Sequence, residues 1–152
     1  MDLDYGEWVR SRRAVLGLTQ HVLAQASGVK QPLISAIESG RRRPTTATRA
    51  ALDRALELRP SFVLERLREQ VGSTIRSHGG RDAVVFGSVA TRTDRPGSDL
   101  DLLVTFEEGR DIVDLLALEA DLAALLTVPV DVVSAGSSGR VAERARHEAV
   151  AL

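Results

Sequence analysis

The sequence predicts a two-part chain of the α+β class: an all-helical bundle over residues 1–58, followed by a small α/β domain over residues 59–152. The first part contains short amphipathic segments separated by turn residues, and the second alternates apolar runs of strand length with segments of helical spacing. Charge divides at the same place: residues 1–59 carry ten Lys and Arg against six Asp and Glu, and residues 60–152 carry ten against fifteen. A basic region favours a polyanionic partner and an acidic region favours bound cations.

Composition indicates a soluble globular protein and excludes cysteine chemistry. With 43% apolar and 27% charged residues the chain is typical of soluble globular proteins. The absence of cysteine excludes disulfides, thiolate metal sites and cysteine nucleophiles. No apolar run approaches the roughly 20 residues of a membrane span, and the acidic start Met1–Asp4 is unlike a signal peptide. We therefore expect a cytoplasmic protein with no membrane partner.

Turn residues divide the first part into four predicted helices. Gly17 ends the first, Ser27-Gly28 ends the second, and Ser39-Gly40 follows the third. The first predicted helix is Tyr5–Leu16, and the second is capped by Thr19 and runs to about Ala26. The third starts at Pro32. The fourth starts at Thr45 or Thr46, and its inward positions are Ala50, Leu52, Ala55 and Leu56.

The second and third of these segments have the spacing of a helix-turn-helix, in which a supporting helix and a tight turn present a recognition helix to the major groove. Gly28 forms the turn, and the inward positions are apolar: Leu23, Ala24, Val29, Ile34 and Ile37. The positions that remain for the outer face of the recognition helix are Gln31, Leu33, Ser35 and Ala36.

Several polar side chains on this outer face suit DNA. Gln and Ser can hydrogen-bond to base edges, and Lys30 can reach a base or a phosphate. Gln20 is placed to meet a phosphate, and an arginine run after the recognition helix can follow the DNA backbone. The candidate DNA-binding residues are Gln20, Lys30, Gln31, Leu33, Ser35, Arg41, Arg42 and Arg43. The alternative is that the arginine run is a solvated loop on a simple bundle.

Residues 5–57 resemble the Xre/Cro-like helix-turn-helix family. The matching positions are Leu18-Thr19-Gln20, Leu23-Ala24, Ser27-Gly28-Val29, Ile34-Ser35, Ile37-Glu38-Ser39-Gly40 and Arg43-Pro44. The resemblance implies a five-helix bundle that binds operator DNA as a dimer.

Leu58-Arg59-Pro60-Ser61 breaks the helical pattern and opens the second part. Apolar residues at helical spacing predict one long helix from Ser61 to about His78, ended by Gly79-Gly80. The remaining predicted elements are the strand Ala83–Phe86, the strand Leu100–Phe106, the helix Ile112–Leu126, the strand Val128–Val133 and the helix Gly139–Ala149. We interpret the arginines of the last helix, Arg140, Arg144 and Arg146, as a solvated face, with partner binding as an alternative.

Two short motifs in this part suit phosphate and metal chemistry. Gly87 lets a phosphate approach the backbone closely, and Ser88 can hydrogen-bond to it. Asp99 and Asp101 lie one residue apart on a strand, so that both carboxylates leave the same face. Each motif alone has an ordinary explanation, a turn for Gly-Ser and a solvated strand edge for Asp-x-Asp.

Asp131 in the strand Val128–Val133 is a third candidate carboxylate. If this strand pairs beside Leu100–Val104, Asp131 lies about 5 Å from the first pair. Three hard oxygen ligands favour Mg²⁺ or Mn²⁺, and two such ions can clamp a triphosphate and activate an attacking oxygen. The alternative is that Asp131 simply points outward.

The stretch Gly87-Ser88, ten residues, then Asp99-Leu100-Asp101 resembles the minimal nucleotidyltransferase (MNT) family, relatives of the polymerase beta superfamily. The likeness extends from about Ser61 to Leu152. It implies that Asp99, Asp101 and Asp131 are catalytic and bind the metals, that Gly87 and Ser88 hold the phosphates of ATP, and that a nucleoside monophosphate passes to an acceptor hydroxyl. Where the family has Ala-Arg-Gly this chain has Ala90-Thr91-Arg92, which makes Arg92 a further candidate phosphate contact.

The two resemblances together imply an antitoxin that attaches AMP to a tyrosine of a cognate HEPN-type toxin and represses its own operon. Operator DNA and the toxin are the expected partners, in a homodimer or a hetero-oligomer with the toxin. Two alternatives remain open: a repressor and antitoxin without catalytic activity that neutralises its partner by binding alone, and a nucleotidyltransferase that acts on RNA.

Overall fold

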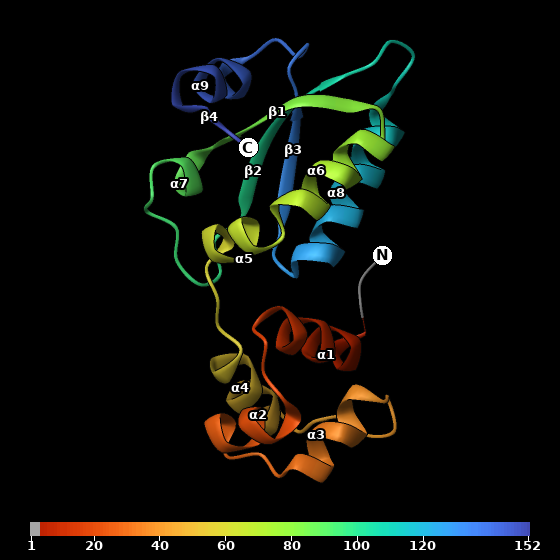
Figure 1. The fold of residues 1–152 in the computed structure, drawn as a ribbon, viewed down its shortest axis with the longest axis vertical. Coiled ribbons are helices and arrows are strands. Elements are labelled where there is room, and N and C mark those ends of the chain that lie inside the picture. Colours follow the sequence, from red (N-terminus) through yellow and green to blue (C-terminus); the bar gives the residue numbers. More distant parts are fainter. Residues whose placement is uncertain (1–3) are drawn as a thin grey trace. The chain divides into compact units, whose positions relative to one another are not determined.

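The computed structural model describes residues 4–152 and divides into two compact units, Met1–Glu57 and Leu58–Leu152 (Figure 1). The first is helical throughout and the second combines helices with a four-stranded sheet, which confirms the predicted α+β class. No helix within residues 4–152 is long and apolar enough to cross a bilayer.

Local capping explains where the helices of the first unit begin and end. The four are α1 (Tyr5–Val15), α2 (Gln20–Ser27), α3 (Gln31–Glu38) and α4 (Thr46–Ala55). The hydroxyls of Thr19 and Thr45 accept hydrogen bonds from the backbone N–H groups of Val22 and Thr48, which satisfies first-turn donors of α2 and α4. Gly28 ends α2 with a left-handed φ of 73°, where other residues would be strained.

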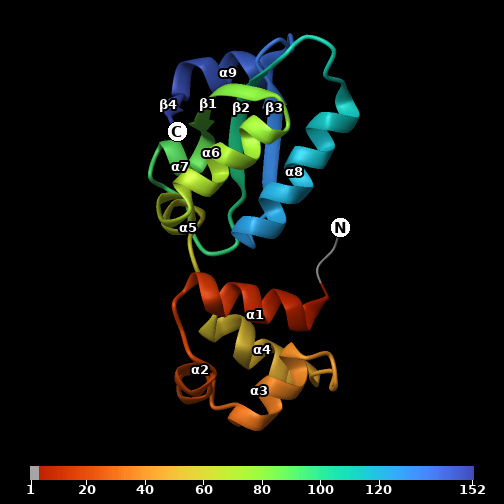
Figure 2. The same cartoon turned by 45° about the vertical axis from the view of Figure 1, so that its right-hand side comes forward.

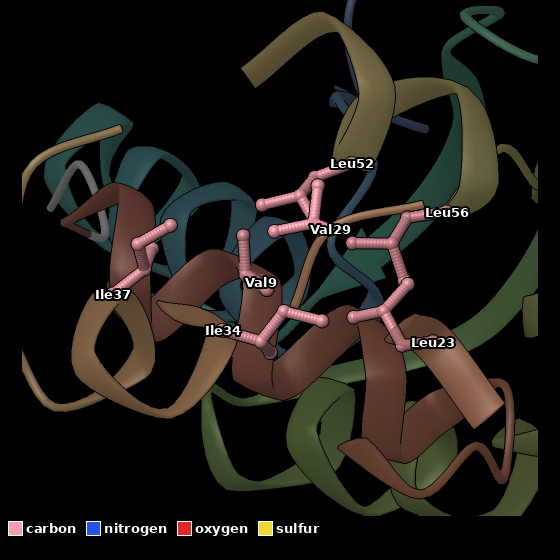
Figure 3. Packing of buried hydrophobic residues seen from close by; sticks show 7 residues of the cluster. All are labelled: Val9, Leu23, Val29, Ile34, Ile37, Leu52 and Leu56. Atoms are coloured by element: carbon pink, nitrogen blue, oxygen red, sulfur yellow. The ribbon is translucent and has the colours of Figure 1, made fainter. Parts of the chain in front are cut away.

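Seven apolar side chains, five from the four helices and two from the segments that follow α2 and α4, form the core of the first unit (Figure 3). None is more than 8% exposed, and burial of each contributes about 1.5–3 kcal/mol. They are Val9, Leu23, Val29, Ile34, Ile37, Leu52 and Leu56. The expectation of five helices is wrong for residues 4–57, which form four, because the next helix buries Val63 and Leu64 in the second unit.

The second unit opens with two helices where one long helix was expected. They are α5 (Pro60–Arg66) and α6 (Arg68–Ser77), separated at Leu67 by a backbone conformation (φ −112°, ψ 20°) outside the helical range. The apolar spacing continues across this bend, so the pattern alone did not show it. Asp94 fixes the start of α5, because its buried carboxylate accepts a hydrogen bond from the Ser61 N–H at 2.9 Å.

The rest of the unit alternates strands and helices. In chain order these are β1 (Gly80–Phe86), α7 (Gly87–Ala90), β2 (Leu100–Phe106), α8 (Ile112–Leu126), β3 (Val130–Ser134), α9 (Arg140–Glu148) and β4 (Val150–Ala151). β2 and α8 have the predicted bounds. β1 begins three residues earlier than expected and β3 two residues later, and β4 was not predicted.

The strands form one mixed sheet in the order β3-β2-β1-β4. β2 runs antiparallel to β1 and parallel to β3, and β4 pairs antiparallel with Val84 and Val85 of β1. The register of β2 and β3 aligns Asp101 with Asp131. The sheet therefore brings together two residues that are thirty positions apart in the sequence.

The two faces of the sheet carry different helices (Figure 2). On one face α6 and α8 cover the side chains of Leu100, Leu102 and Val104, all fully buried. On the other face Ala145 of α9 packs against Phe86 and Leu103. Because successive side chains of a strand alternate between faces, Asp101 shares the face of Leu103 and α9.

Candidate active site and nucleic-acid interface

Three carboxylates converge at one end of the sheet. Asp101 and Asp131 are direct partners across β2 and β3, and Asp99 lies at the end of the loop that leads into β2. One carboxylate oxygen from each of the three lies within 4.8 Å of the others. The geometry that the sequence predicted for Asp99, Asp101 and Asp131 is thus present, and its oxygen donors suit a hard divalent ion.

The electrostatics of this cluster are unfavourable without a cation. Partial burial raises the pKa of Asp101, and the negative charges of Asp99 and Asp131 raise it further. Like charges at this separation repel each other, and a divalent ion that binds all three removes the repulsion. The residues present therefore fit a metal centre.

Gly87 is required by its contact with this cluster. It has a φ of 68°, and a Cβ at this position would collide with the Asp101 carboxylate. Any other residue would be both strained in the backbone and in conflict with a proposed metal ligand. The Gly-Ser motif therefore allows β1 to deliver the chain directly beside the carboxylates.

Ser88 carries a polar atom without a partner. Its Oγ is buried, and no group in residues 4–152 hydrogen-bonds to it. A buried hydroxyl that forms no hydrogen bond costs about 1–3 kcal/mol. A phosphate oxygen bound beside Gly87 would satisfy it, which agrees with the role expected for Ser88.

A cavity of about 490 Å³ lies over this cluster. Its lining combines the Gly-Ser motif and two carboxylates with residues of α9: Phe86, Gly87, Ser88, Asp99, Asp101, Arg140, Val141 and Arg144. The interpretation of Arg140 and Arg144 as part of a solvated face is therefore incomplete, because both also line this cavity. No local sequence signal would have found them, because charged residues four positions apart on a helix are equally typical of a solvated face.

Arg92 does not join the site. It is exposed, has a left-handed φ of 58°, and is absent from the lining of the cavity. Arg92 is therefore not among the residues that the structure brings to the lining of this cavity. The positive charge at the cavity comes from α9.

In the first unit, a hydrogen-bonded network links the helices that a helix-turn-helix must hold in register. Glu38 is buried at the end of α3 and accepts hydrogen bonds from Arg13 Nε at 2.7 Å and Arg13 Nη2 at 3.0 Å. It also accepts one from Gln20 Nε2 at 2.8 Å, and Gln20 in turn accepts one from Gln31 at 2.8 Å. Sequence reasoning missed the role of Glu38, although Arg13 and Glu38 are opposite charges on neighbouring helices.

The predicted DNA-binding residues differ in how accessible they are. Lys30, Gln31 and the run Arg41-Arg42-Arg43 are exposed, whereas Gln20 and Ser35 are half-buried. Leu33 is also half-buried and packs against the core of Figure 3, so its expected place on the outer face is only partly correct. The exposed set leaves a basic surface with one amide side chain, Gln31, at α3 and the turn that follows it.

Two family models match the chain. Residues 71–150 match the polymerase beta nucleotidyltransferase model, and residues 4–63 match a helix-turn-helix domain model. The first match spans the sheet, the Gly-Ser motif and all three carboxylates, and the second spans α1–α4.

Individual proteins agree with these matches. A protein of Methanocaldococcus jannaschii, provisionally named a protein adenylyltransferase, is 32% identical over 74 residues, which cover 49% of this chain and 80% of that protein. A solved structure described provisionally as a minimal nucleotidyltransferase is 45% identical, with a TM-score of 0.54 over 60% of this chain and 95% of its own. The fold also recurs in a toxin–antitoxin complex with AMP-PNP, at 22% identity, a TM-score of 0.50, and coverage of 55% of this chain and 69% of that one.

Proposed function

Because this chain belongs to the polymerase beta nucleotidyltransferase family, we propose that it transfers AMP from ATP to a tyrosine hydroxyl of a HEPN-type toxin and represses its own operon. The observation that carries the catalytic half of the proposal is the convergence of Asp99, Asp101 and Asp131 beside Gly87 and Ser88. The helix-turn-helix carries the regulatory half.

Asp99, Asp101 and Asp131 would hold Mg²⁺ or Mn²⁺. When bound, such ions neutralise phosphate charge and make the acceptor hydroxyl easier to deprotonate. Gly87 gives the triphosphate access to the backbone, and the unpartnered Ser88 Oγ donates a hydrogen bond to it. Each of these residues lies at the same cavity or within the same carboxylate cluster.

The proposed reaction is a displacement at phosphorus. The acceptor oxygen forms a bond to the α-phosphorus of ATP, and the bond from that phosphorus to the oxygen bridging the α- and β-phosphates breaks. Pyrophosphate leaves with that oxygen, and the hydroxyl proton passes to a carboxylate. We assign the proton to Asp131 on the resemblance to the minimal nucleotidyltransferases, and its carboxylate is exposed and therefore open to an acceptor.

A protein acceptor is favoured over a small molecule for two reasons. The 32% identical relative is named for protein adenylylation, and a toxin–antitoxin complex with a bound ATP analogue shares the fold. The carboxylates Asp99 and Asp131 are both exposed, which lets a tyrosine on another protein approach them. The choice of a HEPN-type toxin rests on the resemblance of the Gly-Ser and Asp-x-Asp motifs.

The test of the catalytic half uses the purified chain, the purified product of the adjacent gene, ATP and Mg²⁺. We expect the partner to gain the mass of one AMP, on a tyrosine located by fragmentation mass spectrometry, and Asp101→Asn to abolish the gain. A partner that binds the chain but gains no mass would leave the binding-only antitoxin as the better account. Transfer to total RNA, but not to the partner, would establish the RNA alternative.

The test of the regulatory half is binding to DNA from upstream of the gene. Replacement of Arg41, Arg42 and Arg43 by Ala removes three candidate phosphate contacts, so the slope of log affinity against log salt should become less steep by about 2–3. Gln31→Ala should weaken binding to the operator more than to unrelated DNA. Equal affinity of the wild-type chain for both DNAs would contradict operator recognition.

A further inference from the structure

Helix α9 lies directly over the proposed nucleotide site. Its buried residue Ala145 packs against Phe86, the residue before Gly87, and against Leu103, which is two positions from Asp101. It also contacts α7 and β3. The helix is therefore held against the elements that carry the phosphate and metal residues, and its side chains belong to the same local structure.

Two arginines of α9 face this site. Arg140 and Arg144 lie one helical turn apart and both line the cavity that Ser88, Asp99 and Asp101 line. Within residues 4–152, no other Lys or Arg side chain lines this cavity. A triphosphate brings about four negative charges to a cluster that already holds three, so cations from the protein as well as metal ions are needed there.

The side chain of Arg144 is 70% exposed and has one partner on its own helix. Its Nε donates to Glu148 Oε1 at 3.0 Å, while its two terminal nitrogens make no hydrogen bond to residues 4–152. The second oxygen of Glu148 is buried and has no partner in the same range. A guanidinium fixed through Nε keeps the pair of terminal nitrogens that suits two oxygens of a phosphate.

We propose that α9 forms the phosphate-binding wall of the site, with Arg144, supported by Arg140, binding the polyphosphate of the nucleotide and Glu148 acting as a positioning residue for Arg144. This inference rests on the nucleotidyltransferase half of the proposed function and not on the identity of the acceptor. During transfer the same contacts neutralise the charge of the departing pyrophosphate.

The test is equilibrium binding of ATP, AMP and adenosine to the full chain with Mg²⁺, measured by calorimetry. Arg144→Ala should weaken ATP binding about tenfold or more and leave adenosine binding unchanged, because the lost contact is to phosphate. Arg144→Lys should fall between wild type and Arg144→Ala, and Arg140→Ala should have a smaller effect. Glu148→Gln should weaken ATP binding about two- to threefold, by losing the charged support of Arg144.

Arg66→Ala is the control, since it removes the same charge from an exposed position on α5 and lies outside the cavity lining. Its ATP affinity should match wild type. If Arg66→Ala weakens ATP binding as much as Arg144→Ala, or if Arg144→Ala and Arg144→Lys weaken adenosine and ATP equally, the inference is wrong. ATP binding that depends on Arg144, without transfer to any protein, would support it and overturn the choice of acceptor.

Discussion

The two units differ in whether their buried polar groups have partners. In the first unit, the buried carboxylate of Glu38 accepts hydrogen bonds from Arg13 and Gln20, all within 3.0 Å. In the second, Asp101 is partly buried beside two further carboxylates, and the hydroxyl of Ser88 has no partner in residues 4–152. The paired carboxylate of Glu38 holds helices together, whereas the carboxylates around Asp101 and the hydroxyl of Ser88 remain available to bind a ligand.

The largest expected effect on this difference between the units is that of a substitution at Asp101. We expect Asp101→Asn to reduce nucleotide transfer by roughly 1000-fold or more, because it removes the central metal ligand, and to leave thermal stability unchanged or slightly higher, because repulsion among the carboxylates falls. Radiolabelled ATP and thermal melting measure the two effects. Asp82→Asn, an exposed aspartate on β1, is the control. A loss of stability in Asp101→Asn would show that its charge is structural, as in the first unit.

Glu38 should show the reverse pattern. Glu38→Ala leaves the half-buried Arg13 without its carboxylate partner, and breaking such a pair costs about 3–5 kcal/mol. The free energy of unfolding can be measured for this unit alone, since the single Trp and single Tyr both lie in α1 and fluorescence reports only on it. Glu57→Ala, which removes an exposed carboxylate, should cost much less. A cost below about 1 kcal/mol for Glu38→Ala would remove the contrast between the units.

Mg²⁺ should distinguish the two units, because it should raise the stability of the second unit only. At a concentration 100 times its Kd, an ion that binds the folded site adds about 2.7 kcal/mol to the stability of the second unit. Calorimetry should show this as a rise in one transition, and Trp8 fluorescence should show no change for the first unit. Asp101→Asn should abolish the rise. An equal rise in the first unit would indicate a general salt effect.

The smallest effect concerns Tyr5, whose hydroxyl donates to Asp53 at 2.9 Å. Tyr5→Phe should cost about 1 kcal/mol. Burial, followed by the hydrogen bond to Asp53, raises the pKa of Tyr5 above its ordinary value of 10.0. The folded state therefore favours the neutral hydroxyl, and this stabilisation is present below pH 10 and declines as the pH rises above it.

Unfolding by urea at pH 8 and pH 10.5 tests the prediction on Tyr5. The wild-type chain should lose more stability between these two pH values than Tyr5→Phe loses. If both lose the same amount, another group accounts for the pH dependence and the hydroxyl of Tyr5 is not responsible.

Sequence patterns predicted the elements whose signals are local. Thr19, Thr45 and Gly28 mark helix ends through their own side chains or backbone preferences, and all three act as expected. The bounds of β2 and α8 were also predicted, because each is a continuous apolar or amphipathic run between polar turns. The spacing of the Gly-Ser and Asp-x-Asp motifs located the carboxylate cluster.

Features that depend on contacts between distant segments were not predicted. The bend at Leu67 leaves the apolar spacing intact, and β4 is a two-residue strand that forms only because β1 offers an edge. Arg144 is a charged residue on an amphipathic helix, and nothing in its neighbourhood along the chain distinguishes a solvated arginine from one that faces a cavity. Its role becomes visible only when Ala145 places the helix against Phe86.

The alignment of Asp101 with Asp131 constrains how the length of this unit can change. The Leu100 N–H donates to the Pro129 carbonyl at 2.9 Å, which pins the start of β3 beside the start of β2. One residue inserted next to Pro129 would shift β3 by one position, and a valine would then take the place of Asp131 while the aspartate turned toward α8. The turn at residues 107–110 lies beyond this pairing, so homologous chains should tolerate insertions and deletions there and none beside Pro129.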